Sequence, residues 1–145
     1  MKKLILGMCV AAGLLSCGPS DPDLTCDTSP PAATLATNVQ AVFDTKCKTC
    51  HIADYSYGDY TTAAKTAAIV GKKSLYAGTG ATLLVVDPKS LANSALWLKV
   101  LGGSMSGRTG PKGENVYAKM PNDNSIVLSA DEKKLLKDWI CGGAK

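Results

Sequence analysis

Apolar residues recur at helical spacing in three parts of the chain and predict three helices. The first is expected over residues 34–46, the second over 90–101, and the last from Ser129 onward. Ser129 and Glu132 have the spacing of a capping box, in which each side chain accepts from a backbone N–H of the other residue. The apolar stripes of the first and last helices would consist of Leu35, Val39, Val42 and Phe43, and of Leu135, Leu136, Trp139 and Ile140. The pattern predicts an all-α domain.

The chain between the first two of these helices has a weaker pattern. A short helix is expected over 61–69, with Asp59 as its N-cap and Gly71 following its end. The apolar run 83–86 is short enough to be either a strand or buried extended chain, and the Asp-Pro pair that follows ends it. This part of the domain is the least defined by the sequence.

The N-terminal end lies outside the predicted fold. Two lysines precede an apolar run over 4–15 that is too short to cross a bilayer as a helix, so residues 1–16 are expected to be an export signal. Residues 17–33 are rich in Pro, Asp, Ser and Thr and predict a tether. The remaining residues, 34–145, would form one domain.

Charge says little about partners. The formal net charge is +4, and loss of the two lysines of the signal would lower it. There is no basic stripe with interleaved aromatic residues, so nucleic acid is not an expected partner. Five lysines would either steer an acidic redox partner or be solvated surface: Lys46, Lys48, Lys72, Lys73 and Lys119.

Residues 47–51 read Cys-Lys-Thr-Cys-His and contain the single histidine of the chain. The thiols of Cys47 and Cys50 are spaced to add to the two vinyl groups of one haem, and the imidazole of His51 can then bind the iron. The segment predicts one covalent haem c. The alternatives are a redox dithiol of Cys47 and Cys50, or a zinc site that adds Cys26 and either His51 or Cys141.

A second axial ligand must come from another residue type, and methionine is the natural partner. Met120 lies shortly before the last predicted helix, and Pro121 stiffens the chain after it. Met105, in a glycine-rich loop, is the other candidate. A third alternative leaves the distal position open or water-bound, which would suit a sensor or a peroxidase-like enzyme.

Residues 14–17, Leu-Leu-Ser-Cys, resemble the bacterial lipobox. The resemblance implies cleavage before Cys17, a diacylglycerol on its sulfur, and anchoring by several acyl chains. It implies a lipoprotein of the bacterial cell envelope that faces the periplasm, and Gly18 in place of Asp slightly favours the outer membrane. The alternative is an ordinary secretory signal in which Cys17 is incidental.

Two cysteines remain once the signal, the lipid and the haem have been assigned theirs. Disulfides persist in an oxidising compartment such as the periplasm, so Cys26 and Cys141 are expected to pair. Pairing requires their Cα atoms to lie within about 7 Å. Two unpaired thiols, or pairing with another chain, are the alternatives.

Much of the domain resembles class I c-type cytochromes, including planctomycete-type cytochrome-like domains. The resemblance is carried by residues 39–51, 87–90, 93–97, 119–121, 128–132 and 136–140. Residues 52–86 depart from the family in length and content.

The resemblance implies a compact cytochrome c fold, in which the first and last helices cross around a covalent haem and Phe43 packs against the Trp139 stripe. His51 and Met120 would be the axial ligands. The implied role is electron transfer between redox partner proteins, with no enzymatic step and no separate small-molecule substrate.

Overall fold

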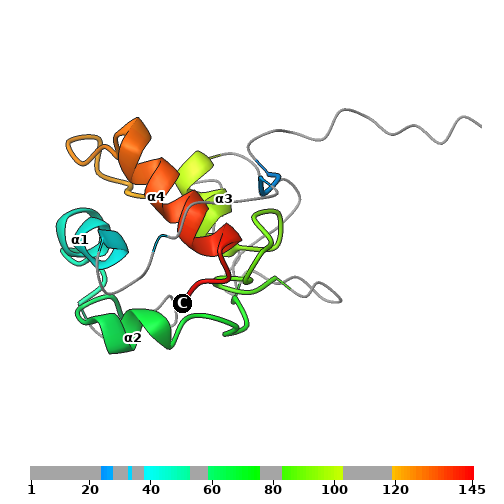
Figure 1. The fold of residues 1–145 in the computed structure, drawn as a ribbon. Helices are drawn as coiled ribbons and strands as arrows, with labels where there is room; N and C mark the ends of the chain where they lie inside the picture. The colour runs from blue at the N-terminus through cyan, green and yellow to red at the C-terminus, as the bar shows by residue number, and fades with distance from the viewer. Residues whose placement is uncertain (1–23, 28–32, 34–37, 53–58, 76–82, 103–118) are drawn as a thin grey trace, which may run out of the picture.

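The computed structural model describes residues 24–27, 33, 38–52, 59–75, 83–102 and 119–145. The expected signal, Cys17, most of the tether and Met105 lie outside these residues. The described elements are α1 (Gln40–Val42), η2 (Phe43–Cys47), α2 (Ala63–Ala67), α3 (Ala95–Leu101) and α4 (Ala130–Cys141) (Figure 1). Among them, no helix has the length and apolar character needed to cross a membrane.

The first helical segment is one continuous run in which α1 passes directly into η2. The Lys48 N–H donates to the Phe43 carbonyl at 2.8 Å, which is the wider i→i+5 turn of a π-helix. Val39, Val42 and Phe43 are buried, as the apolar pattern predicts. The helix expected over 34–46 is thus confirmed in its described part, and it continues to Cys47.

The last helix, α4, begins where the sequence predicts. The Ser129 side chain accepts from the Glu132 N–H at 3.1 Å, and the Ser129 N–H donates to Glu132 Oε2 at 2.7 Å. The predicted capping box is therefore confirmed. Leu136 and Ile140 of the apolar stripe are buried.

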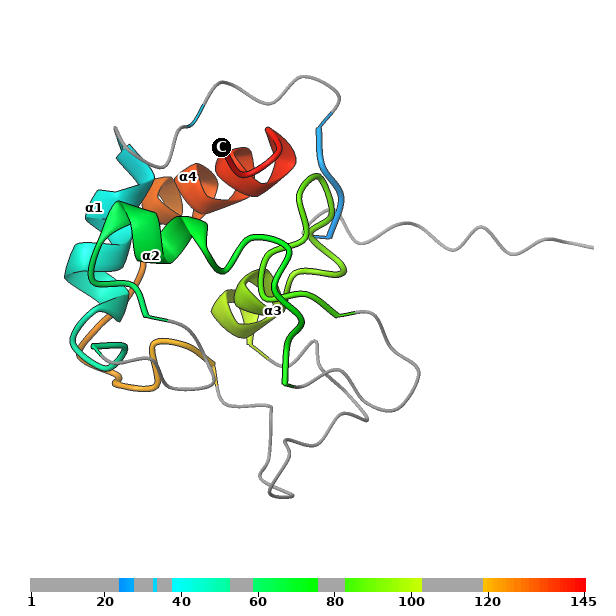
Figure 2. The ribbon, with the colours of Figure 1, turned by 90° about the horizontal axis from the view of Figure 1, so that it is seen from below.

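The first and last helical segments meet through two aromatic rings. The centroids of Phe43 and Trp139 lie 5.9 Å apart, with their planes at 82°, an edge-to-face contact that aromatic pairs favour. Both side chains are fully buried, and the two views show α1 beside α4 (Figures 1 and 2). The expected Phe43–Trp139 contact is confirmed. The cytochrome c fold as a whole remains a prediction.

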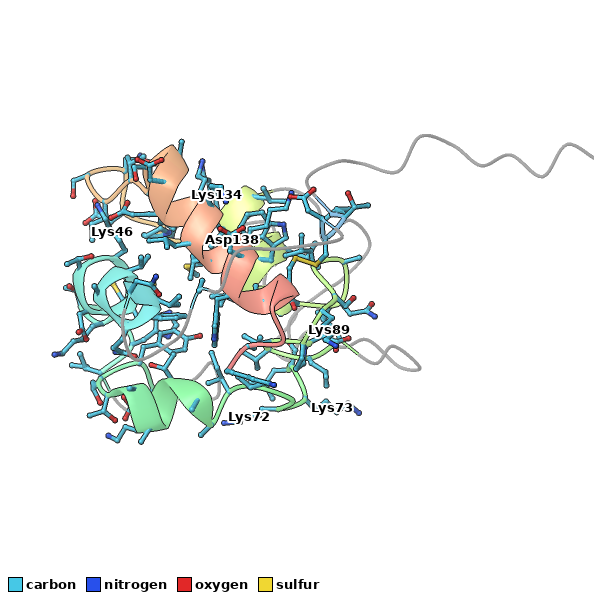
Figure 3. The ribbon with its side chains drawn as sticks, in the orientation of Figure 1. Lys46, Lys72, Lys73, Lys89, Lys134 and Asp138 are labelled. Carbon is cyan, nitrogen blue, oxygen red and sulfur yellow. A yellow bond between two sulfur atoms is a disulfide. The ribbon has the colours of Figure 1, made fainter. Side chains whose placement is uncertain are left out.

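A disulfide ties the N-terminal part of the described chain to the end of α4. The sulfur atoms of Cys26 and Cys141 lie 2.02 Å apart and their Cα atoms 5.4 Å apart (Figure 3). This separation meets the distance condition for pairing and agrees with the pairing expected from the sequence. At the same end of α4, the Lys89 N–H donates to the Ile140 carbonyl at 2.8 Å.

The helix expected over 90–101 is wrong in its first part, because α3 begins only at Ala95. The fully buried Ser94 side chain accepts from the Asp87 N–H at 2.8 Å and donates to the Ser90 carbonyl at 2.7 Å. A serine hydroxyl that bonds the backbone in this way competes with helical hydrogen bonds. Lys89, at φ +68°, adds a left-handed turn. The preceding residues therefore fold into a turn around Ser94.

The short helix α2 is also shorter than expected, and its predicted cap is wrong. Thr62, not Asp59, is the N-cap, and its side chain accepts from the Lys65 N–H at 3.3 Å. The Asp59 carboxylate instead accepts from the N–H and hydroxyl of Thr61, at 2.9 and 2.6 Å, and from Lys65 Nζ at 2.6 Å. Asp59 thus stabilises the turn that leads into the helix.

The apolar run 83–86 forms buried extended chain, one of the two alternatives left open by its pattern. Leu84 makes isolated bridges with both Lys73 and Ser94, and Val86 makes one with Val70. These bridges do not extend into regular strands within the described chain. The described residues are therefore helical with little strand.

Candidate haem-attachment site

Residues 47–51 form a single turn at the end of η2. The Cys47 carbonyl accepts from the Cys50 N–H at 3.2 Å and from the His51 N–H at 3.1 Å. Cys47 and His51 are half-buried, Cys50 is exposed, and both thiols are free. The two thiols and the imidazole are therefore carried on one turn of backbone, and this turn follows directly from the helical segment packed against α4.

The Cys47 thiol is electrostatically unsuited to act as a thiolate. Burial, with smaller contributions from Cys50 and Glu132, raises its pKa to about 12. A dithiol that exchanges disulfides needs a thiolate near neutral pH. The raised pKa therefore counts against a redox-active dithiol at Cys47.

The imidazole of His51 packs against Tyr60. The ring centroids are 4.7 Å apart, with the planes inclined at 42°, and the Tyr60 N–H donates to the His51 carbonyl at 3.2 Å. Burial raises the pKa of Tyr60 above its usual value, so this residue presents a neutral ring to the histidine. Tyr60 is thus a buried residue in ring contact with the histidine.

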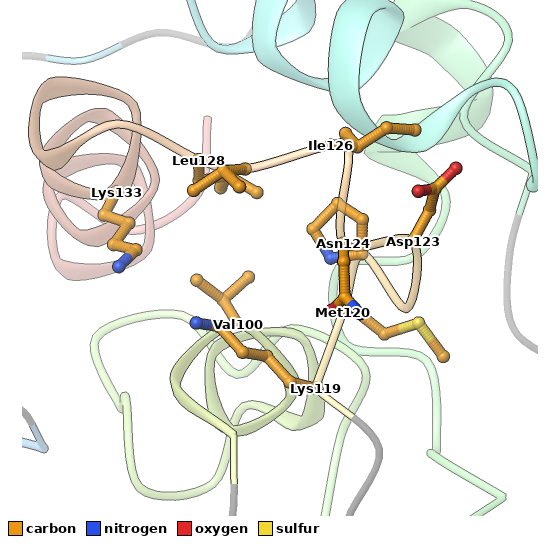
Figure 4. A pocket seen from close by; sticks show the side chains of 10 residues that line it. Val100, Lys119, Met120, Asp123, Asn124, Ile126, Leu128 and Lys133 are labelled. Atoms are coloured by element: carbon orange, nitrogen blue, oxygen red, sulfur yellow. The ribbon is translucent and has the colours of Figure 1, made fainter.

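Met120 begins the segment that leads into α4. Its N–H donates to the Lys99 carbonyl of α3 at 2.9 Å, and its side chain is half-buried. Together with Val100 and Leu128 it lines a pocket of about 80 Å³ (Figure 4). The backbone of Met120 is thus held by α3, and the chain continues from it to the start of α4.

Lys46 connects the cysteine-bearing helix with the segment that carries Met120. Its Nζ atom donates to the Val127 carbonyl at 3.0 Å and lies 3.5 Å from a Glu132 carboxylate oxygen. Lys46 immediately precedes Cys47, and Val127 lines the same pocket as Met120. One lysine therefore holds together the two parts of the chain that carry the predicted haem ligands.

Two large apolar side chains close to these groups are exposed. Ile52, directly after His51, is 62% exposed, and Val127 is 63% exposed. Exposure of apolar surface to water is unfavourable by roughly 25 cal/mol for each Å². Ile52 and Val127 are therefore placed where a bulky apolar group attached to this region could cover them.

The donor chemistry fits haem c. The described residues supply two free thiols at the required spacing, an imidazole next to the second thiol, and a thioether in the segment that Lys46 ties to η2. These are the groups that covalent attachment and two-sided axial ligation need. Met105 and Cys17 lie outside the described residues.

The zinc alternative loses two of its ligands. Cys26 and Cys141 are bonded to each other, which leaves Cys47, Cys50 and His51 for a metal that is normally held by four groups. Among the described residues, no cluster of three or more His, Cys, Asp or Glu side chains has a geometry for a metal ion.

Two functional candidates escaped prediction from the sequence. Lys46 was expected either to steer a partner or to be solvated, but it binds Val127 and Glu132, which lie far away in the chain. Tyr60 was one of three neighbouring tyrosines, and nothing in the sequence distinguishes it as the one in contact with His51. The Lys46–Val127 contact spans 81 positions and the Tyr60–His51 contact spans nine, and neither follows a helical or strand spacing.

No family model matches the chain, and neither a curated protein nor a solved structure shows significant similarity to it. The functional argument therefore rests on the residues themselves.

Proposed function

We propose that this protein is a lipid-anchored monohaem c-type cytochrome that carries single electrons in the bacterial cell envelope. The observation that supports it most is the Cys47–His51 turn at the end of η2, together with the Lys46 contact that brings the Met120 segment against that helix. The lipobox-like residues 14–17 supply the argument for the anchor. The role as electron carrier follows the resemblance to class I c-type cytochromes.

Each residue of the site then has a distinct task. Cys47 and Cys50 would form the thioether bonds, while His51 and Met120 would be the two axial ligands. The bound haem would supply one-electron exchange between Fe(III) and Fe(II). Ile52 and Val127 would be shielded from water at its edge, and Lys46 would keep the methionine segment in place.

The test is expression of the full chain in a bacterium with a c-type cytochrome maturation system. We expect the denatured polypeptide to retain one haem by mass analysis and a pyridine haemochrome spectrum to show thioether-linked haem. The C47S/C50S double variant should be colourless. A colourless wild-type protein would contradict the proposal.

The methionine ligand is tested by a matched pair of variants. In oxidised protein, a charge-transfer band from methionine sulfur to ferric iron should be present in the wild type and in M105A, and absent in M120A. Loss of the band in M105A, with the band retained in M120A, would identify Met105 as the ligand. Its absence in the wild type would favour the open-site alternative, a sensor or peroxidase-like enzyme.

The anchor is tested separately by fractionation. We expect the wild type in the membrane fraction and C17S in the soluble fraction of the envelope. A C17S protein that stays with the membrane would contradict lipidation at this cysteine without affecting the haem assignment.

A further inference from the structure

We propose that Tyr60 is a positioning residue that fixes the rotation of the His51 imidazole, and through it the orientation of the proposed axial ligand plane. The inference rests on the proposed function, because the orientation matters only if His51 binds the haem iron. It concerns a residue outside the Cys-Lys-Thr-Cys-His segment, in the part of the chain that departs from the family it resembles.

Tyr60 contacts His51 at two points, one on the backbone and one on the ring. The Tyr60 N–H donates to the His51 carbonyl at 3.2 Å. The two ring centroids are 4.7 Å apart and the planes are inclined at 42°, within the range in which aromatic rings attract each other. The backbone bond sets where the histidine lies, and the ring contact limits how its side chain can turn.

Other parts of the structure hold Tyr60 itself. It is only 4% exposed, and its ring packs against Phe43 with centroids 5.0 Å apart. Gln40 Nε2 donates to the Tyr60 carbonyl at 3.1 Å. The adjacent Asp59 is fixed by its bonds to Thr61 and Lys65. Because α1, η2 and the turn before α2 all restrain Tyr60, its ring can limit the rotation of the imidazole.

The chemical consequence lies in the direction of the imidazole plane. Neighbouring groups that orient a metal-bound histidine tune the electronic properties of the metal. At a haem, the surroundings of the axial ligand are one of the means by which a protein sets the reduction potential. A fixed plane gives one ligand orientation, whereas a freely turning ring gives a distribution of orientations.

The experiment compares three variants of the full holoprotein by electron paramagnetic resonance of the oxidised form and by redox titration. In Y60L the ring is lost, and we expect a broader low-spin signal with a shifted largest g-value, together with a shifted potential. In Y60F the ring remains, and both quantities should stay as in the wild type. L91A removes an equally buried side chain that belongs to the turn before α3. It should lower stability while leaving the signal and the potential unchanged.

Three outcomes would overturn the inference: Y60L with the wild-type signal and potential, L91A with the same shifts as Y60L, or Y60F with shifts as large as those of Y60L.

If Y60L yields no folded holoprotein, Q40M replaces it, because this change removes the bond to the Tyr60 carbonyl and keeps a side chain of similar shape. A smaller broadening in the same direction is then expected, and an unchanged signal would count against the inference. A wild type without covalent haem would refute the proposed function as well, whereas haem-loaded Y60L with an unchanged signal refutes only the role of Tyr60.

Discussion

The Nζ atom of Lys46 lies 3.0 Å from the carbonyl oxygen of Val127, across 81 positions of sequence. Both the lysine and its second partner, Glu132, have side chains that are 25% exposed. The bond to Val127 is itself exposed, but a hydrogen bond with a charged donor is stronger than one between neutral groups. It stabilises the approach of the Met120 segment to η2.

We expect K46M to lower the free energy of unfolding of the holoprotein by about 1 kcal/mol, because it removes one charge-assisted hydrogen bond and a partly exposed ion pair. The charge-transfer band expected from the proposed Met120 ligand should disappear at a lower denaturant concentration than in the wild type. K48M is the control, since Lys48 is an exposed residue whose pair with Asp44 spans 4.0 Å. Equal losses of unfolding free energy in K46M and K48M would show that the contact with Val127 contributes no more to stability than the exposed pair of Lys48 and Asp44.

The capping box of α4 gives a local prediction. S129A should destabilise the protein by about 1 kcal/mol, because the Glu132 N–H loses its acceptor at the first turn of the helix. S129D should restore most of the loss, since aspartate is also a favoured N-cap. Urea unfolding of the three proteins provides the comparison, and a stable S129A would mean that tertiary packing alone holds the end of α4.

The Cys26–Cys141 disulfide closes a loop of 115 positions. Its removal in a C26A/C141A variant should cost about 2–4 kcal/mol, because the unfolded chain regains the freedom that the cross-link removes. Added reductant should shift wild-type unfolding to the position of the variant. The variant itself should not respond to reductant, and a response would show that another thiol pair contributes.

Asp59 provides a prediction of pH dependence. Hydrogen bonds from the Lys65 and Thr61 side chains, together with the Thr61 N–H, lower its pKa from 3.8 to about 2. A carboxyl whose pKa is lower in the folded state stabilises that state when ionised. Its contribution is complete above the unfolded value and is lost as the pH falls through the folded value.

We therefore expect D59N to be less stable than the wild type by a constant amount at pH 5–7, and the difference to shrink as the pH falls from about 4 to about 2. Thermal unfolding across this range is the measurement. K65M removes the main cause of the lowered pKa of Asp59. In K65M the acid-induced loss of stability should therefore begin at a higher pH than in the wild type. A difference between D59N and the wild type that does not change with pH would be inconsistent with the lowered pKa.

A local pattern predicted the start of α4, but not the starts of α2 and α3. The box formed by Ser129 and Glu132 involves residues three positions apart, so the start of α4 could be read from the sequence. The start of α3 could not, because the buried Ser94 hydroxyl bonds the backbone of Asp87 and Ser90. The periodic apolar residues extend through this turn, and periodicity alone does not show which serine bonds the backbone.

The same division applies to the candidate site. Cys47, Cys50 and His51 are adjacent in sequence, so their chemistry could be predicted as a unit. The placement of Met120 depends on the Lys99 carbonyl and on the Lys46 contact with Val127. Those contacts join distant parts of the chain, and only the fold brings them together.

The disulfide at Cys26 also limits the length of chain that separates the domain from the proposed lipid site at Cys17. Cys26 follows Cys17 by nine positions, and fully stretched chain spans roughly 3.3–3.6 Å for each residue. If Cys17 carries lipid as proposed, the Cys141 end of α4 would stay within about 30 Å of the bilayer. Glu132, beside Lys46, lies nine residues earlier in the same helix, about 14 Å along its axis. Under the proposed lipidation of Cys17, the membrane attachment would therefore lie on the Cys141 side of α4, whereas the turn with Cys47, Cys50 and His51 lies near the Ser129 end of this helix.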